Sequence, residues 1–158
     1  MPKSKLYLET TIPSYLTSRP SRDLVIAGHQ QVTQEWWTRR RSHFDVYVSQ
    51  LVIDEVEAGD AAAVRDRLKA IQGLPLLEIT AEVEELAAAI LASGAIPRRA
   101  ATDAAHIAIA GVHRMDFLLT WNCAHIANAA IARAVARVCR QCGYDCPVIC
   151  TPEELSGE

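Results

Sequence analysis

Three acidic residues lie far apart in the chain, each beside apolar residues. Glu9 follows the apolar run Leu6-Tyr7-Leu8. Glu55 follows Leu51-Val52-Ile53, and Asp103 precedes a stretch rich in alanine and isoleucine. Carboxylates gathered in a partly dry cleft repel one another, and a divalent cation relieves that repulsion. Because such a cation also activates water and neutralises charge on a phosphate, the three acids favour metal-dependent hydrolysis of a phosphoester.

Each acid also has a simpler structural explanation. Glu9 is compatible with a solvated strand end, and Glu55 with a surface position beside Asp54 and Glu57. Asp103 is compatible with a helix N-terminus, where the helix dipole favours a negative charge. The hydrolase hypothesis therefore depends on the three acids meeting in space.

Alternating apolar runs and amphipathic stretches predict the elements that position these acids. Strands are expected at residues 6–8, 44–49, 76–79, 117–121 and 147–149. Helices are expected at residues 22–41, 50–58, 60–71, 80–93, 102–114 and 124–140. Strands that alternate with helices imply a parallel sheet covered on both faces, so the predicted fold class is α/β. No linker or repeat interrupts the pattern, so we expect residues 1–158 to form a single domain.

The predicted elements bring the polar residues to one edge of the sheet. Ligands of open α/β sheets bind beyond the carboxyl ends of the strands. Glu9 ends the first predicted strand, and Asn122 follows the fourth. Glu55 lies on the short helix that leaves the second strand, and Asp103 opens the helix before the fourth. We therefore expect these side chains to share one site.

Composition and charge limit the classes of protein that the chain can belong to. Half of the 158 residues are hydrophobic and the net charge is -3, which predicts a buried core and argues against a general polyanion binder. No apolar run approaches the roughly 18 residues of a membrane span. The N-terminus reaches Glu9 before a signal-peptide core could form, so we expect a cytoplasmic protein without a membrane anchor.

All the cysteines lie near the C-terminus. They are Cys123, Cys139, Cys142, Cys146 and Cys150. An odd number gathered in one region argues against a secreted disulfide framework and favours reduced thiols. The Cys139-x2-Cys142 spacing also fits a zinc ligand pair, although one residue is expected on a packed helix, so buried thiols and a zinc site both stay open.

Four segments in order resemble the PIN-domain ribonucleases, and among them the VapC-type toxins of toxin–antitoxin modules. The segments are residues 7–16, 49–56, 103–108 and 117–122, which carry the positions of Glu9, Glu55, Asp103 and Asn122. The resemblance covers nearly the whole chain and implies a three-layer α/β/α sandwich with a central parallel sheet. Many members have aspartate where this chain has Asn122, and aspartate is also commoner at the position of Glu9.

The resemblance implies a metal-dependent endoribonuclease that uses Mg²⁺ or Mn²⁺. Its catalytic residues would be Glu9, Glu55, Asp103 and Asn122, with the metal held by Glu9 and Asp103 and the attacking water oriented by Glu55. It also implies an RNA substrate, a small antitoxin partner and a homodimer. Because Asn122 lacks a charge, a catalytically decayed PIN-like module that binds RNA or protein is the alternative.

Further residues are candidates for supporting roles. Thr10 and Thr120 are candidates for hydrogen bonds to ligands, and Arg98 and Arg99 for contacts with RNA phosphates. The arginines could equally compensate a helix dipole. His106, one helical turn after Asp103, either supports the site or simply packs in the core, and His125 has the same two interpretations.

Other phosphoryl-transfer classes fit the sequence less well. A phosphate-binding loop of the form Gly-x4-Gly-Lys-Ser/Thr is absent. A receiver-like domain needs a late lysine beside its acidic pocket, whereas the lysines of this chain are Lys3, Lys5 and Lys69.

Overall fold

The computed structural model describes residues 2–157 of the chain. The strands are β1 (Ser4–Leu8), β2 (Phe44–Ser49), β3 (Leu76–Leu77), β4 (Phe117–Leu119) and β5 (Val148–Cys150). The α-helices are α1 (Thr11–Thr17), α2 (Leu24–Arg39), α3 (Gln50–Glu57), α4 (Ala61–Ile71), α5 (Ala81–Ala92), α6 (Ala101–Val112) and α7 (Ala129–Gln141). Short 3-10 helices, η1 (Arg41–His43) and η2 (Arg98–Ala100), precede β2 and α6.

The strands form a parallel sheet in the order β3-β2-β1-β4-β5. β1 lies at its centre, where Tyr7 is opposite Tyr47 of β2 and Leu118 of β4. Parallel strands are covered on both faces and therefore read as continuous apolar runs. Accordingly, Leu6, Tyr7 and Leu8 are completely buried.

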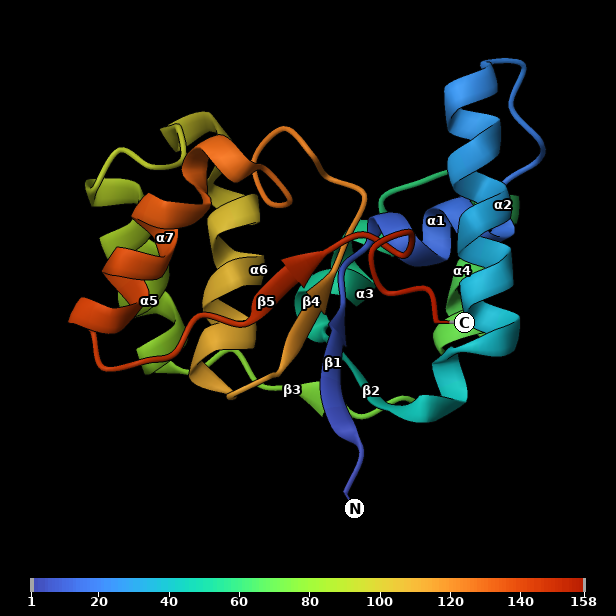
Figure 1. The fold of residues 1–158 in the computed structure, drawn as a ribbon. Coiled ribbons are helices and arrows are strands. Elements are labelled where there is room, and N and C mark those ends of the chain that lie inside the picture. The colour runs from blue at the N-terminus through green and yellow to red at the C-terminus, as the bar shows by residue number, and fades with distance from the viewer. Residues whose placement is uncertain (1, 158) are drawn as a thin grey trace.

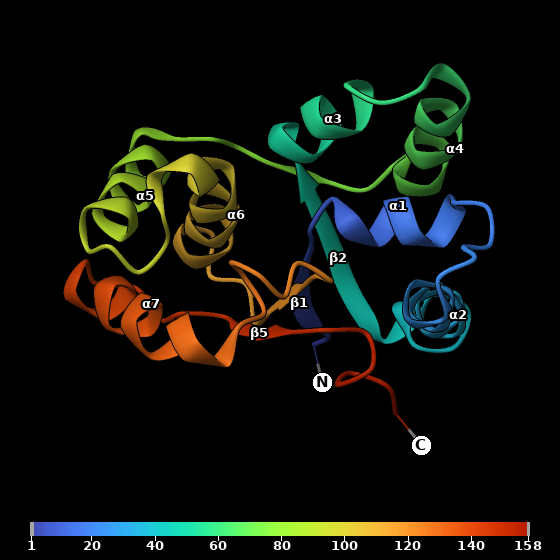
Figure 2. The same ribbon diagram turned by 90° about the horizontal axis from the view of Figure 1, so that it is seen from above.

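Helices cover both faces of this sheet (Figures 1 and 2). α5, α6 and α7 form one layer, in which α5 packs against both α6 and α7. On the other side, α1 packs against α2 and α4, and α3 continues from the end of β2. The predicted α/β/α sandwich with a central parallel sheet is confirmed. None of the helices in the described residues is both long and apolar enough to span a membrane.

The order of strand addition reverses at β1. β2 and β3 add on one side of β1, whereas β4 and β5 add on the other. Ligand sites of open α/β sheets lie at such a reversal, beyond the carboxyl ends of the strands. Residues 9–11 leave β1 at this point and residues 120–122 leave β4. The two segments are joined where the Glu9 backbone N–H donates to the Leu119 carbonyl at 3.1 Å.

Two helices differ from the prediction. The segment around Pro13 is not among the expected helices, but it forms α1. Pro13 is the third residue of that helix, where its missing N–H would have had no acceptor within the helix. α7 begins at Ala129 instead of residue 124, because the Asn128 side chain caps it by accepting from the Ala130 N–H at 2.9 Å. The residues before Asn128 are therefore free to turn toward the site.

Candidate active site

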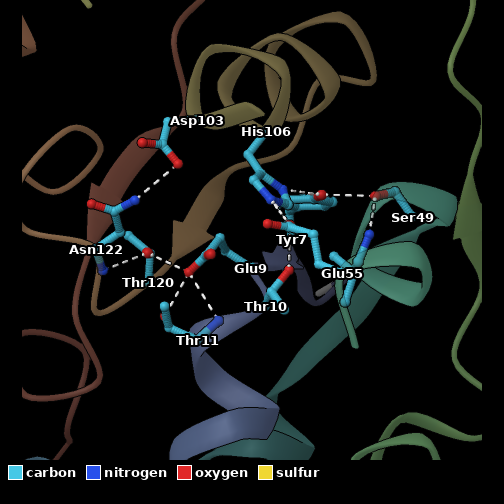
Figure 3. A network of polar contacts seen from close by, with 11 residues as sticks. Tyr7, Glu9, Thr10, Thr11, Ser49, Glu55, Asp103, His106, Thr120 and Asn122 are labelled. Carbon is cyan, nitrogen blue, oxygen red and sulfur yellow. Dashed lines mark hydrogen bonds and ion pairs between the residues drawn. The ribbon is translucent and has the colours of Figure 1, made fainter. Parts of the chain in front are cut away.

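The polar residues at the reversal point come from four elements (Figure 3). Glu9 and Thr10 follow β1, and Thr120 and Asn122 follow β4. Glu55 comes from α3, whereas Asp103 and His106 lie one turn apart on α6.

The Glu9 side chain is buried, with an exposed fraction of only 3%. Its Oε1 accepts hydrogen bonds from the Thr11 N–H at 3.1 Å, the Thr11 hydroxyl at 2.5 Å and the Thr120 hydroxyl at 2.6 Å. The contacts of residues 2–157 include none to its Oε2. The carboxylate is thus fixed by one oxygen and keeps the other for a ligand.

Glu55 is held in the same way. Its Oε1 accepts from the Thr10 hydroxyl at 2.7 Å and from His106 Nε2 at 2.5 Å. Burial acts to raise the pKa of Glu55, but the hydrogen bonds from His106 and from the Thr10 hydroxyl lower it below the ordinary value. Glu55 is therefore a carboxylate at neutral pH, and 34% of its side chain is exposed.

His106 belongs to a buried chain of hydrogen bonds. Its ring is completely buried, and its Nδ1 lies 2.7 Å from the Tyr7 hydroxyl. The Tyr7 hydroxyl lies 2.8 Å from the Ser49 hydroxyl, and Ser49 also caps α3 by accepting from the Val52 N–H. Burial raises the pKa of Tyr7, so its phenol keeps its proton.

Asp103 has different surroundings. Its Oδ1 accepts from Asn122 Nδ2 at 3.0 Å, and its Oδ2 lies 3.1 Å from His125 Nδ1. Asn122 Oδ1 in turn accepts from the His125 N–H at 3.1 Å. The amide nitrogen of Asn122 therefore faces Asp103, while its amide oxygen accepts a backbone hydrogen bond from the turn that follows.

The structure brings some of the predicted site residues closer together than others. One ligand atom each of Glu9, Glu55 and His106 lies within 4.8 Å of the others. Asp103 does not belong to this group, within residues 2–157, although its helix also supplies His106. The assignment of the metal to Glu9 and Asp103 thus stays a prediction, and the geometry adds Glu55 as a ligand candidate.

The predicted supporting residues fall in two places. Thr10 and Thr120 donate to the two glutamates, so their hydroxyls fix carboxylates in this structure. Arg98 and Arg99 are exposed in η2, shortly before Asp103 on the next helix. Their contacts with RNA stay a prediction.

Sequence reasoning did not identify the parts played by Tyr7, Ser49 and Thr11. Tyr7 reads as a core residue because it lies between two leucines of a buried strand. Thr11 carries the stronger signal, since it lies only two residues after Glu9, close enough in the chain for its backbone N–H and its hydroxyl to donate to that carboxylate.

The cysteines form no metal-binding cluster in the part of the chain that the structure describes. All five are free there, and Cys139 and Cys150 are buried. The contact with Cys146 and, to a smaller extent, burial raise the pKa of the Cys139 thiol, which is typical of a thiol in the core. The reduced state of these thiols stays a prediction.

Comparison with protein families identifies the family to which this fold belongs. The PIN domain family model matches residues 24–123, which is more than half of the chain. The chain belongs to the PIN domain family. Comparison with curated proteins and with solved structures gave no significant match. The matched range runs from the start of α2 to the turn after β4, and it contains Glu55, Asp103 and Asn122 but not Glu9.

Membership in the PIN family implies the fold of a metal-dependent nuclease. The residues present fit a hard divalent cation, because two carboxylates lie close together and each keeps one oxygen without a hydrogen bond among the described residues. Glu9 follows β1, where the strand order reverses, and Glu55 lies close to it on α3.

Proposed function

We propose that this PIN domain is an endoribonuclease that hydrolyses RNA phosphodiester bonds with Mg²⁺ or Mn²⁺. The observation that carries the proposal is the convergence of Glu9 and Glu55 at the strand-order reversal of a PIN sheet. Two carboxylates are costly to hold this close unless a cation joins them. The hard oxygen ligands favour Mg²⁺ or Mn²⁺ over softer metals.

The chain's own residues have distinct tasks in this proposal. Glu9, anchored by Thr11 and Thr120, would hold the ion, together with Glu55 or Asp103. When bound, the ion supplies a lowered water pKa and neutralises charge on the phosphate. Glu55 stays ionised at neutral pH and is partly exposed, so it is suited to orient or deprotonate the attacking water.

The acidic site needs cationic residues nearby to attract RNA. Arg98 and Arg99 are exposed at the end of the sheet from which α6 starts, which is the end that carries the site. Arg39, Arg40 and Arg41 lie instead before the start of β2, at the opposite end of that strand from Ser49 and α3. Arg98 and Arg99 are thus the better candidates for phosphate contacts.

A decayed PIN module that binds RNA or protein is the second candidate function. The observation that favours it is the hydrogen bond that the Asn122 amide donates to Asp103. An acid at position 122 would add a negative charge to the site, whereas the amide is neutral. In that case the acidic site would keep its shape without cleaving RNA.

A cleavage assay distinguishes the two functions. Wild-type protein and a Glu9→Gln/Asp103→Asn double variant are incubated with single-stranded and hairpin RNA, with Mg²⁺, Mn²⁺ or EDTA. We expect cleavage by the wild type with metal alone, and its loss in the double variant. Glu57→Gln is the matched control, because Glu57 is exposed at the end of α3. Equal cleavage by the double variant would reveal a contaminating nuclease, and metal-bound wild type without cleavage would favour the binding module.

We further propose that the protein is the toxin of a type II toxin–antitoxin pair, and that it acts as a cytoplasmic homodimer bound by a small antitoxin. A surface for a partner is available at the start of α2, where Leu24 and Val25 are 88% and 67% exposed. Growth arrest on expression of the wild type, relieved by a short open reading frame next to its gene, supports the toxin role. Normal growth would count against it.

Residues 1–158 are proposed to form one PIN-like domain. β1 and β5 lie outside the matched range, but they pair with β4 in the same sheet. Limited proteolysis that yields a stable fragment lacking either strand would contradict this proposal.

A further inference from the structure

His106 has a partner on each of its ring nitrogens. Nε2 lies 2.5 Å from Glu55 Oε1, and Nδ1 lies 2.7 Å from the Tyr7 hydroxyl. The ring is completely buried between these partners. A metal-ligating histidine needs one ring nitrogen with a free lone pair. In this arrangement neither nitrogen is free.

The partners also determine the direction of the hydrogen bonds. The Glu55 carboxylate can only accept, so His106 Nε2 carries the proton that is donated to it. In the neutral ring Nδ1 then accepts from the Tyr7 phenol. The Tyr7 oxygen is left to accept from the Ser49 hydroxyl. Every donor in this series of hydrogen bonds therefore has an acceptor, and no group in the series other than the Glu55 carboxylate needs to carry a charge.

The path of hydrogen bonds from Glu55 through His106 and Tyr7 to Ser49 begins and ends at the same helix, α3. Ser49 accepts from the Val52 N–H and so caps α3, which also carries Glu55. The contacts run from α3 through β1 to α6 and back to α3, because Tyr7 belongs to β1 and His106 to α6. This closed path fixes both the helix and the side chain that it presents (Figure 3).

We propose that His106 is a positioning residue: together with Tyr7 and Ser49 it holds Glu55 beside Glu9, and the cation is bound by oxygen atoms alone. This inference rests on the proposed metal-dependent function. His106 and Thr10 both occupy Oε1 of Glu55, so its Oε2 is the oxygen left for the ion. A nitrogen ligand would instead require the contact between His106 and Glu55 to break.

Mn²⁺ binding tests this role, because the Mn²⁺ ion is paramagnetic and its spin reports on the atoms that coordinate it. Electron spin-echo spectroscopy on the Mn²⁺-loaded wild type is expected to show no directly bound imidazole nitrogen. Titration calorimetry is expected to show that Tyr7→Phe and His106→Ala weaken Mn²⁺ binding by about 10-fold to 100-fold, as is usual when the residues that support a ligand are removed. His106→Gln should stay close to the wild type, since its amide N–H can replace Nε2.

Tyr47→Phe is the matched control, because Tyr47 lies on β2 beside Tyr7 and has no side-chain hydrogen bond among the described residues. It should bind Mn²⁺ as the wild type does. Circular dichroism confirms that each variant is folded, and Tyr7→Phe removes a single oxygen, so it keeps the test informative if His106→Ala unfolds.

The outcomes separate this inference from the proposed function. A nitrogen coupling that disappears in His106→Gln would make His106 a ligand and overturn the positioning role. Tyr7→Phe and His106→Ala variants that bind Mn²⁺ like Tyr47→Phe would also overturn it. Normal Mn²⁺ binding without RNA cleavage would contradict the nuclease and leave the positioning role supported, whereas a wild type that binds no Mn²⁺ would overturn both.

Discussion

Glu9 and Glu55 each gather their hydrogen bonds on one carboxylate oxygen, whereas Asp103 engages both of its oxygens. We call Glu9, Glu55 and His106 the glutamate half of the site, and Asp103, Asn122 and His125 the aspartate half. Thr120 joins the halves, because its hydroxyl donates to Glu9 and accepts from the Asn122 N–H at 2.9 Å. The glutamate half has carboxylate oxygens that are free to bind a cation, whereas both oxygens of Asp103 in the aspartate half already contact side chains of the protein.

The difference teaches how one substitution changes a cluster of acids. An aspartate at position 122 would leave Asp103 beside a second negative charge, and a cation would be needed to relieve the repulsion. The amide of Asn122 provides a donor instead, and the pair is stable without an ion. Metal affinity is therefore expected to reside mainly in the glutamate half.

The largest effect on Mn²⁺ affinity is expected when one carboxylate of each half is substituted in turn. Glu55→Gln should weaken Mn²⁺ binding by roughly 100-fold or more, since a unit charge about 4 Å from a divalent cation is attracted to it by about 8 kcal/mol at an effective dielectric constant of 20, and desolvation of the carboxylate offsets only part of this attraction. Asp103→Asn should cost clearly less. Titration calorimetry measures both variants against Glu57→Gln. The reverse order would instead support the sequence-based assignment of the metal to Glu9 and Asp103.

A smaller effect is expected when the aspartate half is made more like the glutamate half. Asn122→Asp removes the donor to Asp103 and adds a charge, so it should strengthen Mn²⁺ binding by about 10-fold. The metal-free variant should melt at a lower temperature than the wild type, because its two carboxylates repel. Differential scanning calorimetry with and without Mn²⁺ measures both changes. A variant that melts like the wild type in both conditions would show that the amide is not what neutralises Asp103.

The smallest effect is a change of stability with pH in the glutamate half. The pKa of Glu55 is lowered from 4.5 in the folded protein, because the contacts with His106 and Thr10 outweigh the opposing effect of burial. A lowered folded-state pKa contributes stability above the unfolded pKa, and this contribution is lost as the pH falls below about 4.5. Urea unfolding between pH 3 and 6 should therefore show a steeper loss for the wild type than for Glu55→Gln. Parallel curves would indicate that the contacts of Glu55 do not favour its charged form.

The sequence predicted the fold well, because parallel strands and their covering helices leave different periodic patterns. It also placed Glu9, Glu55 and Asp103 correctly on their elements, since each acid interrupts or borders an apolar run. The division of the site into halves was not predictable in the same way. It depends on hydrogen bonds such as that between Tyr7 and His106, whose positions in the chain differ by 99 residues. A tyrosine in a buried strand and a histidine on an apolar helix carry no local sign that they meet.

The central place of β1 in the sheet also determines when the site can exist during synthesis. β1 is made before its neighbour β4, which begins at Phe117, and one of the two hydroxyls that anchor Glu9 belongs to Thr120. A nascent chain that ends before these residues lacks one of the two strands that flank β1, and with it one of the anchors of Glu9. The acidic centre is therefore completed only after the segment as far as Thr120 has been made.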